Sequence, residues 1–286
     1  MSSGASRLGG SNENVHMKTS KLLILGFGME NLCDLLFEVS NEDRLGILTR
    51  LGEDPMNVTG LSRDLGVTTQ EASRHLSRLS VIGLTEKDPE GLHHITPYGE
   101  LTLIQIQDLD FTSQHKDYFR THVLTAIPRE FVCRMGELDG SRYLDDVIVA
   151  IHSIEKTMKE AEEYLLNINT PYISSTFPLI RDVYERGIEA RFIHTRDFAP
   201  HEVMREDYRR ELGQIPLARL SGLLEERLME KTDLVLYMSE KGVAILALPL
   251  QGGSFDFHGF TSDDPRSHRW CSELFEYYWE RAEPKR

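Results

Sequence analysis

The sequence predicts an α/β protein, α+β in its overall arrangement, with a helical N-terminal domain and a second domain built on a mixed sheet. Three observations predict this class. Helical periodicity with capping residues runs through residues 40–83, a short hairpin signal follows at residues 84–97, and strand and helix signals alternate from residue 144 onward. A chain of 286 residues has room for two such domains.

Residues 67–83 form the most distinctive predicted helix. Thr68 and Glu71 stand at the spacing of a capping box, and Gly83 can end the helix. Apolar residues recur at helical intervals on one face, namely Ala72, Leu76, Leu79 and Ile82. The other face carries polar side chains that suit base edges and phosphates, namely Gln70, Ser73, Arg74, Ser77 and Arg78. We expect this face to contact a DNA groove.

Two shorter helices and a hairpin flank this helix. Residues 59–65 predict a helix that Gly66 can end in the left-handed conformation, and Ser40 with Asp43 begins another one upstream. The Pro and Gly of residues 88–91 predict a tight turn between two short strands. Helix, turn, helix and hairpin together predict a winged helix-turn-helix domain.

This stretch resembles winged-helix regulators of the arsenical-repressor-like kind. The resemblance rests on the runs Asp64-Leu65-Gly66-Val67-Thr68, Ser73-Arg74-His75-Leu76, Ile82-Gly83-Leu84 and Ile95-Thr96-Pro97-Tyr98-Gly99. It implies binding to double-stranded DNA. The expected DNA contacts are Thr68, Thr69, Gln70, Ser73, Arg74, Ser77, Arg78, Lys87 and His93. A guanidinium can bind guanine or phosphate with two hydrogen bonds, which favours the two arginines. The alternative is a winged-helix scaffold that binds protein and reads no DNA.

The charge of the chain is unusual for a DNA-binding protein. The formal net charge is −14, and residues 67–97 hold more acidic than basic side chains. Affinity for nucleic acid normally rests on counterion release by a basic surface. We therefore expect salt-sensitive binding with few phosphate contacts. His93 and His94 could add positive charge when protonated.

The segments on either side of this domain are predicted from composition and periodicity. Residues 1–20 are rich in Ser, Gly and Asn, which predicts a disordered tail. Residues 21–28 resemble the strand and glycine turn of a dinucleotide fold, but Asn31 stands in place of the third glycine. We therefore expect a leading helix through Leu32, Leu35 and Leu36 that packs on the winged domain. Residues 99–112 predict a connecting helix, which either pairs with a second copy in a homodimer or packs within one chain.

The first domain is accordingly expected at residues 21–112, a linker at 113–127 and the second domain at 128–286, because Ile127-Pro128 breaks the helical pattern. The second domain alternates helices and strands. Helices are expected at residues 144–168, 178–186 and 201–212, and strands at residues 172–177, 189–195, 234–239 and 243–248.

The C-terminal residues carry a second resemblance. Asp256-Phe257-His258-Gly259-Phe260, Asp263-Asp264-Pro265, Trp270-Cys271, Leu274-Phe275 and Tyr277-Tyr278-Trp279 place many aromatic residues on and before one terminal helix. This pattern resembles the effector domain of archaeal winged-helix regulators known as methanogenesis or filament-regulator-like proteins. It implies a transcriptional regulator of archaeal type whose mixed-sheet domain is a sensor. The resemblance supplies no ligand residues.

Candidate sensor residues are therefore chosen by their chemistry. A polar pocket with an aromatic wall, suited to a small-molecule effector, could be lined by Ser174, Thr176, Arg191, His194, Asp256 and Trp270. The alternative for Trp270 is a place in the core. For Arg191 and Asp256 the alternative is a structural ion pair or a place on the surface.

Other classes of function lack their motifs. Phospholipase D-like hydrolysis needs a His and a Lys two residues apart, and the one such pair, His16 and Lys18, lies in the tail that is expected to be disordered. His258, His268 and Cys271 match no zinc spacing. We expect no enzyme activity, no metal and no cofactor. The three cysteines are far apart, which indicates a reducing setting, and no apolar run is long enough to span a bilayer. A cytoplasmic protein without membrane contact is the expectation.

Overall fold

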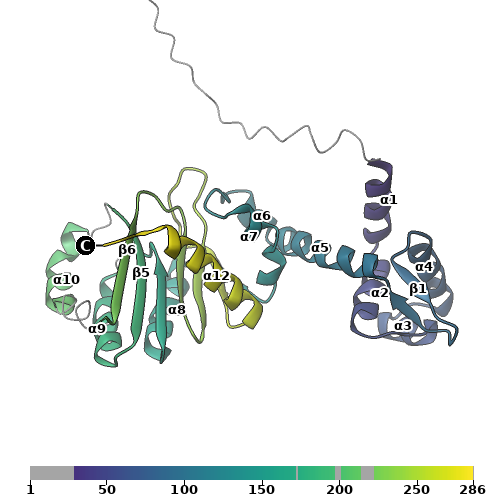
Figure 1. Cartoon of the computed structure of the whole chain (residues 1–286), viewed down its shortest axis with the longest axis horizontal. Coiled ribbons are helices and arrows are strands. Elements are labelled where there is room, and N and C mark those ends of the chain that lie inside the picture. The colour runs from purple at the N-terminus through teal and green to yellow at the C-terminus, as the bar shows by residue number, and fades with distance from the viewer. Residues whose placement is uncertain (1–28, 172, 197–200, 214–221, 286) are drawn as a thin grey trace, which may run out of the picture. The chain divides into compact units, whose positions relative to one another are not determined.

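The computed structural model describes residues 29–171, 173–196, 201–213 and 222–285. The chain divides into two compact units, Met1–Leu103 and Ile104–Arg286, which we call the N-terminal unit and the C-terminal unit. Helices and a mixed sheet together confirm the predicted α/β class (Figure 1). The expected tail at residues 1–20 and the glycine-containing segment 21–28 lie outside the described residues. The leading helix predicted through Leu32, Leu35 and Leu36 is present at residues 29–39.

The N-terminal unit consists of helices followed by a hairpin (Figure 1). Its elements are α1 (Met29–Val39), α2 (Glu42–Glu53), α3 (Val58–Leu65), α4 (Thr69–Val81), β1 (Thr85–Lys87) and β2 (His93–Ile95), and α5 (Pro97–Gln114) begins in it. This order is the one that the sequence predicts. The β1–β2 turn closes as expected, with Gly91 in the left-handed region at φ 93°.

Capping explains where these helices begin and end. Thr68 forms a capping box with Glu71, and Gly66 ends α3 at φ 69°, as predicted. The starts of α2 and α3 differ from the prediction by one or two residues. Asn41 and Asn57, rather than Ser40 and Thr59, accept the first free backbone N–H groups.

One apolar cluster holds the N-terminal unit together. It joins α2, α3 and α4 to the start of β1 through Ile47, Leu48, Leu51, Leu61, Leu76, Leu79 and Leu84. Each such side chain contributes about 1.5–3 kcal/mol when fully buried. The buried face of α4 fixes the helix in rotation, and the opposite face is therefore held toward solvent.

The C-terminal unit is a mixed sheet with helices on both faces. Its strands are β3 (Arg142–Leu144), β4 (Tyr164–Ile168), β5 (Glu189–Thr195), β6 (Leu224–Met229), β7 (Val235–Ser239), β8 (Gly242–Ala247), β9 (Gly259–Ser262) and β10 (Glu283–Pro284). Their order is β10-β6-β5-β4-β7-β8-β9-β3. Strands β4, β5 and β6 run parallel, and the other pairs are antiparallel.

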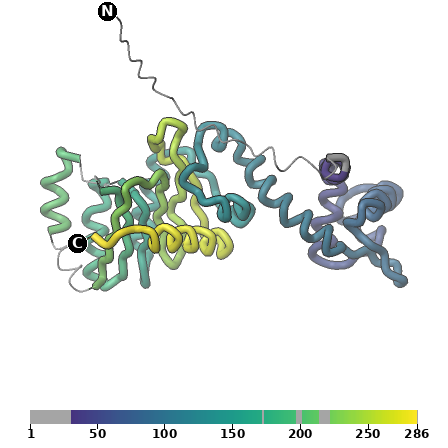
Figure 2. Tube along the Cα trace, turned by 45° about the horizontal axis from the view of Figure 1, so that its top comes forward, coloured from purple at the N-terminus to yellow at the C-terminus, as the bar shows by residue number. Residues whose placement is uncertain are grey.

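Two apolar cores lie on the two faces of this sheet. The helices are α6 (Lys116–Phe119), α7 (Arg129–Val132), η2 (Met135–Leu138), α8 (Val147–Glu160), η3 (Ser174–Thr176), α9 (Phe177–Glu185), η4 (Glu202–Met204), α10 (Arg205–Leu212) and α12 (Pro265–Arg281). One core forms under α12, which lies across the sheet in Figures 1 and 2. The other forms between the sheet and α8 with α9.

The predicted helix at residues 144–168 is wrong in its second half. Helix α8 ends at Glu160, and residues 164–168 form the central strand β4. The apolar spacing continues by coincidence through Leu165, but strands on both sides supply backbone partners that a helix here would lack. The expected strand at residues 172–177 is also absent, because 174–176 are a 3₁₀ turn and Phe177 begins α9. Tyr172 lies outside the described residues.

The structure also differs from the predicted linker. The boundary between the units falls at Leu103, and residues of the 113–127 segment lie in the core of the C-terminal unit. Tyr118 is 3% exposed, and its hydroxyl accepts a hydrogen bond from the Leu248 amide at 2.8 Å. Pro128 breaks the helical pattern, but it does not show whether the residues before it are buried. Their apolar side chains are buried, and the segment therefore belongs to the core of the C-terminal unit.

Candidate nucleic-acid interface

Helix α4 presents a polar stripe to solvent. Gln70, Ser73, Arg74 and Ser77 are all exposed and follow the helical repeat, with Thr69 beside them at the start of the helix. Within the part of the chain that the structure describes, none of these side chains has a hydrogen-bond or ion-pair partner. The opposite face of α4 is buried. The stripe therefore keeps its donors and acceptors available to another molecule.

Thr68 is occupied by its capping role. Its hydroxyl donates to the Glu71 carboxylate at 2.7 Å and accepts from the Glu71 amide at 3.2 Å. These hydrogen bonds and the one from the Thr68 amide hold the pKa of Glu71 below its usual value. Thr68 thus positions the start of the stripe, and its hydroxyl is not free for DNA as the sequence had suggested.

Arg78 is held in an ion pair that the sequence did not indicate. Its guanidinium donates two hydrogen bonds to Glu38 of α1, at 2.9 and 2.6 Å, and lies 5.3 Å from the centre of the Phe37 ring. Arg44 is 3.1 Å from the same carboxylate. The hydrogen bonds from Arg78 are the largest cause of the lowered pKa of Glu38. The prediction of Arg78 as a preferred DNA contact is corrected, because its charge is already compensated.

The β1–β2 hairpin offers one of its two predicted contacts. Lys87 is exposed at the end of β1 and has no ion-pair partner among the described residues. His93 is 8% exposed, and burial lowers the pKa of its imidazole, so the expected contact and positive charge at His93 are wrong. His94 pairs with Asp88 at 2.7 Å, which lowers the pKa of that carboxyl group.

Sequence reasoning missed one further cation. Arg63 lies on α3, its side chain is 80% exposed, and its nearest carboxylate is that of Asp64 at 3.9 Å. Leu61 packs in the core, and Leu65 packs against it from a partly buried position. Placing these two leucines on a helical wheel would have turned Arg63 outward and shown it as a candidate.

The predicted pocket residues of the C-terminal unit do not come together. Thr176 and His194 line one cavity beside α8 and α9. Ser174 is exposed and outside it. Asp256 pairs with His122 at 3.2 Å, and its pKa is lowered although burial alone would raise it. Hydrogen bonds from His258 and His122 cause the lowering, so Asp256 is structural.

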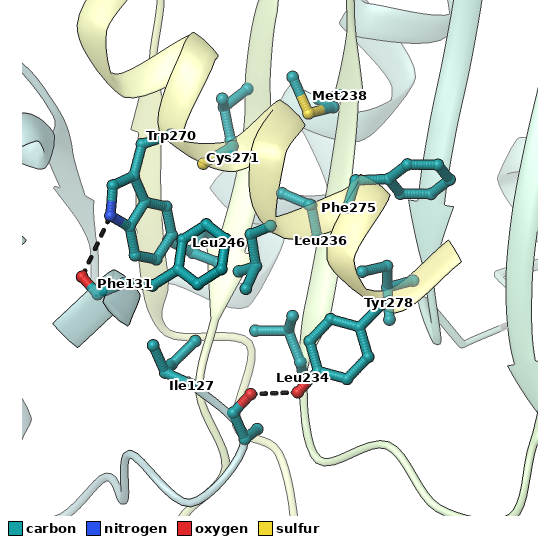
Figure 3. Close-up of a cluster of buried hydrophobic side chains, with 14 of the residues drawn as sticks. Ile127, Phe131, Leu234, Leu236, Met238, Leu246, Trp270, Cys271, Phe275 and Tyr278 are labelled. Atoms are coloured by element: carbon teal, nitrogen blue, oxygen red, sulfur yellow. Dashed lines mark hydrogen bonds between the residues drawn. The ribbon is translucent and has the colours of Figure 1, made fainter. Parts of the chain in front are cut away.

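Arg191 and Trp270 lie on the opposite face of the sheet from that cavity. Arg191 donates to Glu276 of α12 at 2.5 and 2.8 Å and stacks 4.3 Å over Trp279. Trp270 is 1% exposed, and its Nε1 donates to the Phe131 carbonyl at 3.3 Å (Figure 3). Both residues stabilise α12 against the sheet, which corrects their proposed role in a pocket.

The structure also bears on whether the chain has a metal site, a reactive cysteine or a membrane-spanning helix. Among the described residues, no three His, Cys, Asp or Glu side chains are placed to hold a metal ion together. Cys271 lies on the buried face of α12, and burial raises the pKa of its thiol (Figure 3). None of the described helices has the length and apolar character required to cross a bilayer.

Comparison with known proteins gives weak structural likenesses. Neither a protein-family model nor a curated protein matches the chain. The archaeal chromatin protein TrmBL2, whose structure shows a novel mode of DNA binding, is 16% identical over 90% of this chain and 100% of that chain, with a TM-score of 0.40. The O-methyltransferase NcsB1 of neocarzinostatin biosynthesis is 10% identical over 74% of this chain and 67% of its own, with a TM-score of 0.23. An O-methyltransferase family protein from Burkholderia thailandensis is 12% identical over 72% and 65%, with a TM-score of 0.24. Scores this low carry no argument about function.

The expectation that the chain is not an enzyme is nevertheless corrected. S-adenosylmethionine-dependent methyltransferases are among the solved structures that match it. The low TM-scores assign no reaction and no catalytic residue to this chain.

Proposed function

We propose that the N-terminal unit is a winged helix-turn-helix domain that binds double-stranded DNA through α4, and that the protein is a sequence-specific transcriptional regulator. The observation that carries this proposal is the polar stripe of Gln70, Ser73, Arg74 and Ser77, exposed and unpartnered among the described residues. The stripe begins in the first turn of the second helix of an α3–turn–α4 pair. Residues at that end of such a helix reach base edges in the major groove.

The side chains of the stripe match the chemistry of base edges. Arg binds guanine, and Gln binds adenine, with two hydrogen bonds each, while Ser donates to or accepts from several bases. Lys87 and Arg63, exposed on the hairpin and on α3, suit phosphate contacts on either side. With four side chains suited to bases and only two cations suited to phosphates, we expect hydrogen bonds to the bases to contribute more to DNA binding than charge does.

Fluorescence anisotropy tests the proposal with labelled duplexes from the DNA upstream of the gene, first at low salt. Arg74→Gln removes one guanidinium from the stripe and should weaken specific binding about 5- to 150-fold. Arg50→Gln is the matched control, because Arg50 is also an exposed helical arginine and pairs only with Glu53, at 3.1 Å. Equal affinity of the two folded variants would refute the assignment. No binding of the wild-type chain to any fragment would favour the protein-interaction scaffold.

We propose further that the protein acts as a homodimer through α5. The helix carries four large apolar side chains that are 47–61% exposed, and water disfavours such exposure: Tyr98, Leu101, Ile104 and Leu109. Pairing two copies would present two recognition helices to successive major grooves. Light scattering tests it: Leu101→Asp with Ile104→Asp should give a monomer, and a dimer in that variant would contradict the role of α5.

We also propose that the C-terminal unit binds a small-molecule effector. The support is the cavity that Thr176 and His194 share, since the other predicted residues stand elsewhere. An effector changes DNA affinity only if it binds one state of the protein more tightly than another. The effect is measured as the shift in the DNA Kd when the effector is added.

A further inference from the structure

The cavity of the C-terminal unit lies between α8, α9 and the sheet face that carries β4, β5 and β7. The cavity has a volume of about 40 Å³. This space exceeds the roughly 10–15 Å³ that one water needs. Most of its wall is apolar, formed by side chains such as Ile154, Met158, Ile173, Ile180, Phe192 and Leu224.

Two hydroxyl groups in this wall have unmet hydrogen-bonding capacity. Tyr237 is 2% exposed and Thr170 is 7% exposed, and neither hydroxyl has a hydrogen-bond partner among the described residues. Native proteins satisfy nearly all buried polar atoms, because leaving one without a partner is costly. Hydroxyls that line a cavity and lack a partner among the described residues are groups that a bound molecule could satisfy.

The charges around the cavity decide what kind of molecule fits. Of the described residues that line it, none is Lys or Arg, and the His194 ring already lies 3.7 Å from the Glu226 carboxylate, so an anion would meet a negative charge and no permanent counter-charge. The carboxylate of Glu226 is compensated by Lys285 at 2.9 Å and lies 3.7 Å from the His194 ring. A cation would therefore compete with an existing ion pair. An uncharged molecule meets neither obstacle.

We propose that this cavity binds a small uncharged ligand with an apolar, ring-sized body and a hydroxyl or carbonyl group that hydrogen-bonds to Tyr237 and Thr170. The Asn167 side chain, whose Oδ1 accepts from the Thr170 amide at 3.1 Å, orients the loop that carries Thr170. Regulation of DNA binding by this ligand rests on the proposed effector function of the C-terminal unit. Binding itself can be measured without DNA.

The test uses the full chain with phenol and cyclohexanol as neutral probes and benzoate as the charged probe of similar size. Calorimetry and thermal unfolding should show saturable binding of the neutral probes and none of benzoate. Tyr237→Phe and Thr170→Val each delete one hydroxyl with little change in volume, and each should weaken phenol binding about tenfold, the worth of one hydrogen bond. Tyr164→Phe is the matched control, because its hydroxyl faces His268 at 3.5 Å, outside the cavity.

The ligand-free variants give a second readout. Deleting a buried hydroxyl without a partner should leave the Tm of Tyr237→Phe equal to or above that of the wild type. A lack of saturable binding by both neutral probes overturns the proposal, and so does unchanged phenol affinity in both cavity variants. DNA binding is measured in a separate experiment. If the cavity binds no probe, the proposed DNA interface of α4 is unaffected, and if the chain binds no DNA, ligand binding to the cavity can still be measured.

Discussion

The salt dependence of DNA binding follows from the cations that the N-terminal unit leaves free. Arg74 and Lys87 are exposed and have no ion-pair partner among the described residues, and Arg63 is 80% exposed with Asp64 only at 3.9 Å, whereas Arg78 is bound by Glu38. Each cation that displaces a counterion from duplex DNA, whether it lies on a phosphate or on a base edge between the phosphates, contributes about 0.9 to the slope of log K against log salt, so three such cations give about −2.7 for one copy and about −5.4 for two. For one copy, affinity then falls about 40-fold between 50 and 200 mM salt.

Two charge-neutralising variants separate the free arginine from the paired one. Arg74→Gln should make the slope shallower by about 0.9 per copy. Arg78→Gln should leave the slope unchanged and lower the stability instead, because Glu38 would lose both of its hydrogen bonds from Arg78. Anisotropy titrations at several salt concentrations give the slopes, and urea unfolding gives the stabilities.

Either of two results would refute this reasoning. If Arg78→Gln reduced the slope as much as Arg74→Gln, the ion pair with Glu38 must open on DNA, and the structure would misidentify the contacts. A wild-type slope far steeper than about −5.4 would show that cations elsewhere on the chain dominate binding.

Three further predictions concern stability and reactivity. Gly99→Ala should destabilise the N-terminal unit by about 1–3 kcal/mol in urea unfolding, because the new Cβ would lie 2.2 Å from the Leu84 carbonyl oxygen. Glu38 has a folded-state pKa below its ordinary 4.5, so its pairing stabilises the protein fully above about pH 4.5 and is lost as the pH falls through the folded value. Arg78→Gln should flatten that part of the stability–pH curve. Burial raises the pKa of the Cys271 thiol, so a thiol reagent should label the two exposed cysteines of the native protein and Cys271 only after unfolding.

The helices of the N-terminal unit were predictable because local rules fix them. The capping box at Thr68, the left-handed Gly66 and the apolar spacing through Leu79 act within a few residues of one another. Which polar side chains remain free was not predictable in the same way. Glu38 is 40 residues from Arg78, and only the packing of α1 brings the two together.

The predicted set of pocket residues was wrong, and the alternation of side chains along a strand could have shown this from the sequence. Arg191 and His194 are three residues apart on β5, so the alternation of side chains places them on opposite faces of the sheet. Tyr237 was overlooked because a tyrosine in an apolar strand resembles an ordinary core residue. Its unpaired hydroxyl becomes informative only once the cavity beside it is known.

The acid excess of the chain constrains how α4 would recognise DNA. Binding without sequence preference rests almost wholly on phosphate contacts, and few cations are free to make them. Hydrogen bonds to base edges do not depend on net charge, so the contributions of Gln70 and Arg74 to specific binding remain. If α4 reads DNA as proposed, the domain should bind random duplexes weakly and gain most of its affinity at the correct site. Its discrimination between sequences would therefore be set by a few side chains on one helical stripe, and the ion pair of Arg78 helps by keeping that helix in place.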